Sequence, residues 1–158
     1  MTMKTTTERD YLFQAAGRFW VIPELTLTEL PDGSLGLAQQ EADRVHRAIA
    51  NEVCGKPVDL NALELEFLCD VTGVLYTEVA DLLAVHKSTV TKWRQAGAVP
   101  HLASLALKKT FWFRLFGAQL EAWQVPVGRL EDEEAFLALA RREAIEQELV
   151  GPVVVKAA

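Results

Sequence analysis

Cysteine and histidine are scarce in this 158-residue chain, which has only two and three of them respectively. Cys54 and Cys69 stand alone, and His46, His86 and His101 do not have the spacing of metal ligands. The chain also lacks a glycine-rich phosphate loop and a serine or cysteine in a nucleophile motif. We therefore expect no cofactor, no metal site and no enzymatic activity, with both cysteines as small core residues of a reduced, cytoplasmic protein.

Long apolar runs are also missing. No stretch approaches the ~20 apolar residues that a membrane-spanning helix needs. The first ten residues, MTMKTTTERD, lack the apolar segment of a secretory signal. These features predict that no membrane is involved. Hydrophobic residues make up 50% of the chain, which is enough for the core of one domain with appendages or of two small domains.

A third absence is local, because residues 82–120 contain no Asp or Glu although the whole chain has a net charge of -6. Attraction to phosphate is screened over roughly 8–10 Å at physiological salt, so a local cationic surface matters more than the total charge. This stretch indicates a nucleic-acid partner. The alternative is a basic face that pairs with the chain's own acidic parts. Its cations are Lys87, Lys92, Arg94, Lys108, Lys109 and Arg114.

Turn and cap signals divide the chain into four parts and predict a mainly α fold. Residues 1–10 are expected to be a disordered tail. Residues 11–57 are expected to form a small antiparallel β-meander and then a helix over residues 41–53. Residues 58–117 are expected to form a five-helix-type helix-turn-helix domain. Residues 118–158 are expected to add a C-terminal helical extension, with a helix over residues 131–149.

The meander is read from two runs and a turn. The first run, Arg18 to Ile22, is expected to end at Pro23, and residues 25–30 then alternate with a period of two. Residues 31–34 read as a turn, after which a return strand begins at Leu35.

Helix ends are marked equally clearly in the central part. Asn61 and Glu64 have the spacing of a capping box at a helix start. Gly73 and Gly97 suit the left-handed position that ends a helix. Pro100 suits the first turn of a long helix that reaches Phe116.

The segment from Leu75 to Gly97 has the pattern of two short helices joined by a tight turn. Ala80 is small where the two helices come closest, and the polar side chains of the second helix share the outward face. Small hydroxyls and cations on a short second helix suit the major groove of DNA. The inward positions are Val79, Leu83, Val85, Val90 and Trp93.

On these residues the chain resembles the phage-repressor-like (Xre) helix-turn-helix proteins, and within them the HigA- and MqsA-type antitoxins. The strong part of the resemblance covers residues 58–117, and residues 63–68 resemble the family's first helix. The chain departs from the family pattern with Ala84 in place of the turn glycine, Tyr76 in place of glutamine, and His86 in place of a serine or threonine N-cap. The matching residues are Glu78, Val79, Ala80, Leu82, Leu83, Val85, Ser88, Thr89, Val90, Thr91, Lys92 and Trp93.

The resemblance implies a set of DNA-contacting side chains. Lys87, Ser88 and Lys92 are expected to contact base edges, and a lysine favours the guanine acceptors O6 or N7. Thr91 is expected to reach a thymine methyl group or a phosphate. The expected contacts to the backbone are His86, Thr89, Tyr76, Thr77 and Gln95.

The function expected from the resemblance is transcriptional repression. Such a protein binds double-stranded DNA at a palindromic operator as a homodimer, autoregulates its operon, and neutralises a basic toxin protein through a part outside the DNA-binding domain; residues 11–57 are expected to be that part. The alternatives are a stand-alone repressor of phage, plasmid or defence genes, and a protein-interaction module that uses the helix-turn-helix as a scaffold. For the aromatic groups of residues 111–123, a dimer surface and a monomeric core are both open.

Overall fold

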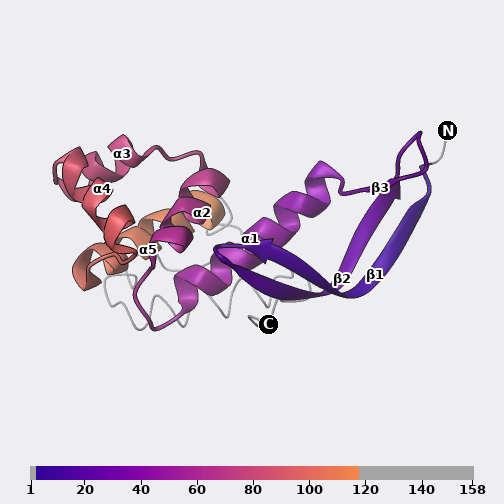
Figure 1. The fold of residues 1–158 in the computed structure, drawn as a ribbon, viewed down its shortest axis with the longest axis horizontal. Coiled ribbons are helices and arrows are strands. Elements are labelled where there is room, and N and C mark those ends of the chain that lie inside the picture. Colours follow the sequence, from indigo (N-terminus) through magenta and orange to yellow (C-terminus); the bar gives the residue numbers. More distant parts are fainter. Residues whose placement is uncertain (1–2, 118–158) are drawn as a thin grey trace.

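The computed structural model describes residues 3–117, in which a three-stranded antiparallel sheet precedes five helices (Figure 1). This arrangement confirms the mainly α fold with a small N-terminal β-meander. The expected C-terminal extension, residues 118–158, and its helix over 131–149 lie outside the described residues. The strands are β1 (Thr5–Ala15), β2 (Arg18–Glu29) and β3 (Leu35–Gly36), and the helices are α1 (Gln39–Gly55), α2 (Ala62–Thr72), α3 (Tyr76–Leu83), α4 (Lys87–Ala96) and α5 (His101–Phe116).

The sheet differs from the expected one in its first strand. Residues 5–10, expected in a disordered tail, belong to β1, and residues 5–9 pair with β2, with Thr5 opposite Thr28. Threonine favours strands, but this half of β1 is exposed on both faces and so carries no apolar alternation. The expectation of a disordered tail is therefore wrong for these residues.

Strand β2 also continues through Pro23, where the sequence predicted an end. The ladder is interrupted there, between the Arg9–Glu24 and Tyr11–Ile22 pairs, because proline has no N–H to donate. Before the proline the buried side chain is the even-numbered Ile22, and after it the buried side chain is the odd-numbered Leu25. Both side chains therefore reach the same core as α1, although they lie on different faces of an ideal strand.

The turn of the β1–β2 hairpin meets α2 (Figure 1). Ala16 and Gly17 both have positive φ, 53° and 77°, as in the tight turn that matches the twist of a hairpin. A Cβ atom on Gly17 would lie 2.4 Å from Leu63 Cδ1, so a larger residue there would have to displace the Leu63 side chain and adopt a positive φ. The hairpin is thereby seated against the helical part of the chain.

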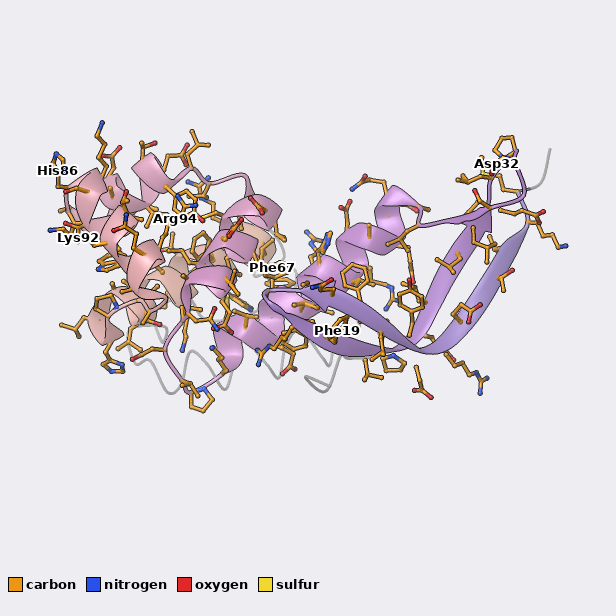
Figure 2. The ribbon with its side chains drawn as sticks, in the orientation of Figure 1. Phe19, Asp32, Phe67, His86, Lys92 and Arg94 are labelled. Carbon is orange, nitrogen blue, oxygen red and sulfur yellow. The ribbon has the colours of Figure 1, made fainter. Side chains whose placement is uncertain are left out.

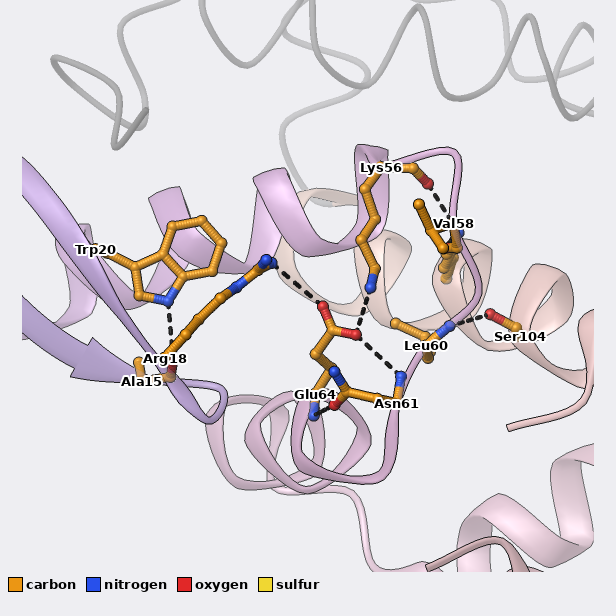
Figure 3. A network of polar contacts seen from close by, with 10 residues as sticks. Ala15, Arg18, Trp20, Lys56, Val58, Leu60, Asn61, Glu64 and Ser104 are labelled. Carbon is orange, nitrogen blue, oxygen red and sulfur yellow. Dashed lines mark hydrogen bonds and ion pairs between the residues drawn. The ribbon is translucent and has the colours of Figure 1, made fainter. Parts of the chain in front are cut away.

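A buried carboxylate holds the same junction together (Figure 3). The side chain of Glu64, at the start of α2, is fully buried and accepts hydrogen bonds from the Asn61 backbone N–H and from Lys56 Nζ. Arg18 of β2 adds a longer contact of 3.4 Å. The capping box expected at Asn61 is confirmed, and the structure adds two cations from distant parts of the chain.

Helices α3 and α4 form the expected helix-turn-helix. Val79, Ala80 and Val90 are buried between them. Helix α3 ends in a Schellman motif, in which the Val85 N–H donates to Ala80 O at 3.0 Å and the Ala84 N–H donates to Asp81 O at 3.2 Å. Ala84 occupies the left-handed position with φ 53°, so an alanine adopts the conformation that a glycine usually has in this turn.

The aromatic side chains of α5 close the core of the single chain. Phe111, Trp112 and Phe116 are at most 1% exposed, and the Trp112 indole N–H donates to Asn51 Oδ1 of α1 at 3.1 Å. Phe111, Trp112 and Phe116 therefore belong to the core of the single chain, whereas Phe113 is half-buried and Trp123 lies outside the described residues. Within residues 3–117 no helix is long and apolar enough to cross a membrane.

Candidate nucleic-acid interface

Helix α4 carries its polar residues on an exposed face at the end of the molecule away from the sheet (Figure 2). This face borders a surface hollow of about 480 Å³ between α3 and α4. The hollow brings together most of the predicted DNA-contacting residues, from both ends of the motif. They are Tyr76, Thr77, Lys87, Ser88, Thr91, Lys92 and Gln95.

The two lysines of this face are unpaired within the described residues. Neither Lys87 nor Lys92 has a carboxylate oxygen within 4.0 Å, and both side chains are exposed. The first turn of α4 contains no acidic residue. The ammonium groups are therefore available to an acceptor from outside the described chain, such as a base edge or a phosphate.

His86 and Thr89 do not line the hollow. His86 is the N-cap of α4, and its Nδ1 accepts the backbone N–H of Ser88 at 3.2 Å. The same nitrogen lies 2.8 Å from Ser88 Oγ, so the serine hydroxyl already has a partner. Because Nδ1 is an acceptor here, Nε2 carries the ring proton and remains a donor. The histidine replaces the usual serine or threonine cap by the same kind of contact.

Thr91 and Thr89 differ in how accessible they are to a partner. The hydroxyl of Thr91 donates to Lys87 O at 3.2 Å, which leaves its methyl group and its oxygen lone pairs for a partner. Thr89 is half-buried, whereas Thr91 is exposed. The structure therefore favours Thr91 over Thr89 as a contact residue.

Arg94 is a candidate contact residue that the sequence reasoning did not select. Its guanidinium lies 4.1 Å from the centre of the Tyr76 ring, and it forms no ion pair within residues 3–117. Stacking on an aromatic ring holds an arginine in place while its N–H groups stay available. The spacing of Tyr76 in one helix and Arg94 in the next gave no signal for this contact.

Tyr76 itself is only partly available. Its ring borders the hollow, but its hydroxyl oxygen is buried with no hydrogen-bond partner among the described residues. Burial raises the pKa of Tyr76, while the nearby Arg94 charge opposes that rise. The hydroxyl is therefore not presented to a phosphate in this structure.

The cationic stretch of the sequence is not one surface. Lys108 is 2% exposed, and its Nζ donates to Lys56 O at 2.8 Å and to Val58 O at 2.6 Å. It holds the α1–α2 linker against α5 and is not available to DNA. Arg114, near the end of α5, borders a different hollow beside α1. The exposed cations of the α4 surface are Lys87, Lys92 and Arg94.

Metal-ligating side chains and cysteines of the described part of the chain also bear on function. No group of three His, Cys, Asp or Glu residues there is placed to hold a metal ion. Burial raises the pKa of the Cys54 thiol to about 12 and that of Cys69 to about 11. Both cysteines are buried and stay protonated at neutral pH, as expected for core residues.

Comparisons with known proteins provide no further guide to function. No protein-family model matches this chain, and searches of curated proteins and of solved structures gave no significant match.

Proposed function

We propose that this chain is a sequence-specific DNA-binding repressor that reads its operator with α4. The observation that carries the proposal is the exposed face of α4, where Lys87 and Lys92 lack acidic partners among residues 3–117 and border one hollow with residues from both ends of the motif. A short helix with cations near its N-terminus suits the major groove. One such helix contacts few base pairs, so we propose a homodimer on an inverted repeat.

The proposal is tested by footprinting and gel shifts on the DNA immediately upstream of the gene. Lys92→Ala is expected to weaken binding to that operator by about 1–3 kcal/mol and to relax the preference at one base pair. Arg114→Ala is the matched control, because it removes an exposed cation of the same acid-free stretch that borders a different hollow. Its operator affinity is expected to equal that of the wild type.

Two outcomes would contradict the proposal. Equal weakening by the two substitutions would mean that only the net charge matters. If footprinting finds no protected region in the upstream DNA, the protein-interaction module is favoured instead. If Lys92→Ala weakens binding to operator and random DNA equally, Lys92 contacts phosphate and does not read a base.

The proposal includes capture of a partner protein, a toxin of basic character, by a surface outside the helix-turn-helix. What supports this part is the net charge of -8 over residues 1–81, most of which precede the helix-turn-helix. A stand-alone repressor lacks such a partner. A small basic protein that co-purifies with the chain, encoded beside its gene, distinguishes the two.

A further inference from the structure

An open groove lies where the hairpin turn meets α1 and α2. A second hollow, bordered by Leu63 and Glu66 of α2 and by Arg94 of α4, adjoins both this groove and the hollow between α3 and α4. We call the open groove the tip groove: it is bounded by the turn at residues 15–17, by His46 of α1, and by Glu66, Phe67 and Asp70 of α2. Its volume is about 480 Å³. Volumes of ~300–1,000 Å³ are typical of sites that enclose a ligand.

One face of α2 supplies most of the groove wall. Leu63, Glu66, Phe67, Asp70 and Val71 recur at steps of three and four residues, so they share a single helix face. A face of this pattern is normally covered, yet Leu63 is 54% exposed and Val71 is only half-buried. Phe67 lies beside the hairpin turn, between the two parts of the molecule (Figure 2).

Two rings, those of His46 and Phe67, form the floor of the groove. The ring of His46 lies edge-on to Phe13 of β1, with centroids 5.6 Å apart, and to Phe67 of α2, with centroids 6.0 Å apart. Burial lowers the pKa of His46, against a smaller opposing effect of Asp43, so the ring is neutral at neutral pH. The floor therefore brings no positive charge to the groove.

The two carboxylates on the wall form no ion pair with a described residue, although Glu66 borders a second hollow with Arg94, and Asp70 a third with Arg47 and Arg114. Glu66 and Asp70 are exposed, and no cationic nitrogen lies within 4.0 Å of either in the described part of the chain. Like charges four residues apart on a helix destabilise it slightly. The pair is thus placed beside aromatic rings at a small cost in helix stability, with its acceptor oxygens unused.

Carboxylates beside aromatic faces match one kind of side chain best. A guanidinium stacks on aromatic rings and donates two parallel hydrogen bonds to a carboxylate, which a lysine cannot do. The apolar residues of the groove suit the aliphatic stem of the same side chain and an apolar neighbour. A cationic segment of a partner protein therefore complements the groove in both charge and polarity.

We infer that the tip groove is a docking site for an arginine-bearing segment of a partner protein. The inference deepens the partner-capture part of the proposed function, on which it rests, by naming the surface and the chemistry of the captured segment. It does not depend on DNA binding by α4.

The test uses the full-length chain and a fluorescein-labelled peptide, Gly-Gly-Arg-Leu-Arg-Gly-Gly, followed by fluorescence anisotropy. The same peptide with citrulline in place of both arginines keeps the shape and removes the charge. We expect saturable binding of the arginine peptide and at least about tenfold weaker binding of the citrulline peptide. Backbone amide shifts are expected to map to residues 14–17 and 66–71.

Variants then locate the binding. Glu66→Gln with Asp70→Asn is expected to weaken binding of the arginine peptide about tenfold, with a urea midpoint no lower than that of the wild type because the like-charge pair is removed. Glu8→Gln with Glu24→Gln removes two exposed carboxylates from the neighbouring strands of the hairpin, away from the groove, and is expected to bind like the wild type.

Three results would overturn the inference: no saturable binding, equal affinity for the two peptides, or equal weakening by the two double variants. The gel shift of the wild-type chain on upstream DNA is scored separately. If the chain does not shift upstream DNA but binds the arginine peptide, the DNA-binding proposal is refuted and the docking site stands. If it shifts DNA but does not bind the peptide, the docking site is refuted and the DNA-binding proposal stands.

Discussion

The left-handed alanine in the helix-turn-helix turn leads to a prediction about stability. Ala84 and Gly97 end α3 and α4 in the same Schellman motif, with φ of 53° and 77°. The Gly97 N–H donates to Arg94 O at 3.3 Å and the Ala98 N–H to Trp93 O at 3.2 Å, which repeats the pattern at Ala84. The two positions therefore differ in whether a Cβ atom is present.

The magnitude follows from two opposing effects. A left-handed conformation costs a residue with a Cβ atom roughly 1–2 kcal/mol, and glycine avoids this cost. Glycine in turn loses about 0.5–1 kcal/mol more than alanine through its greater freedom in the unfolded chain. The Ala84 side chain is exposed, so little apolar burial is lost. Ala84→Gly is therefore expected to raise the free energy of unfolding by about 0.5–1 kcal/mol.

Equilibrium urea unfolding of three variants measures this. Gly97→Ala is expected to lose about 0.5–1 kcal/mol, and a Cβ atom at Gly97 would meet nothing within 4 Å, so the loss comes from the backbone alone. Ala106→Gly, an exposed position inside α5, lacks the strain relief and is expected to lose about 0.5–1 kcal/mol. The reasoning is refuted if Ala84→Gly destabilises the chain as much as Ala106→Gly does.

Three further predictions concern buried polar groups. Glu64→Gln removes the charge that Lys56 and Arg18 share, so urea unfolding is expected to show a loss of roughly 2–3 kcal/mol; an unchanged midpoint would mean that the carboxylate acts only as a cap. Lys108→Met leaves two carbonyl acceptors without their ammonium donor and is expected to cost roughly 2–4 kcal/mol, without changing the salt dependence of DNA binding measured by gel shift. A smaller salt slope would instead place Lys108 against DNA. Burial holds the pKa of His46 below 6.5, so the folded chain binds fewer protons than the unfolded one, and its stability is full above about pH 6.5 and falls as the pH drops below that value. Unfolding titrations of His46→Gln are expected to show a flatter pH dependence, and an identical profile would contradict the assignment.

Several features of the fold could be predicted from the sequence because they are encoded within a few residues. The capping box at Asn61 and Glu64 and the glycine ends at Gly73 and Gly97 depend on side chains no more than three positions from the helix end. The inward residues of the helix-turn-helix follow from helical periodicity. That periodicity also placed most of the candidate contact residues in one hollow, because they share one face of α4 or the start of α3.

Strand β1 could not be predicted, because an edge strand exposed on both faces has no apolar alternation, and its pairing depends on β2 across the turn. The stacking of Arg94 on Tyr76 was missed for a similar reason, since it joins two helices whose relative placement the pattern does not specify.

By itself the sequence determined which segments are helices, where most of them end and which face of α4 is polar, since these depend on neighbours a few residues apart. Only the tertiary structure decided how the charges are used. It buried Lys108 against two carbonyl groups and surrounded Glu64 with cations from 8 and 46 residues away. It left Glu66 and Asp70 without an ion pair among the described residues. The physical reason is that the energy of a charge depends on its solvent exposure and its neighbours in space, and distant segments set both when they pack.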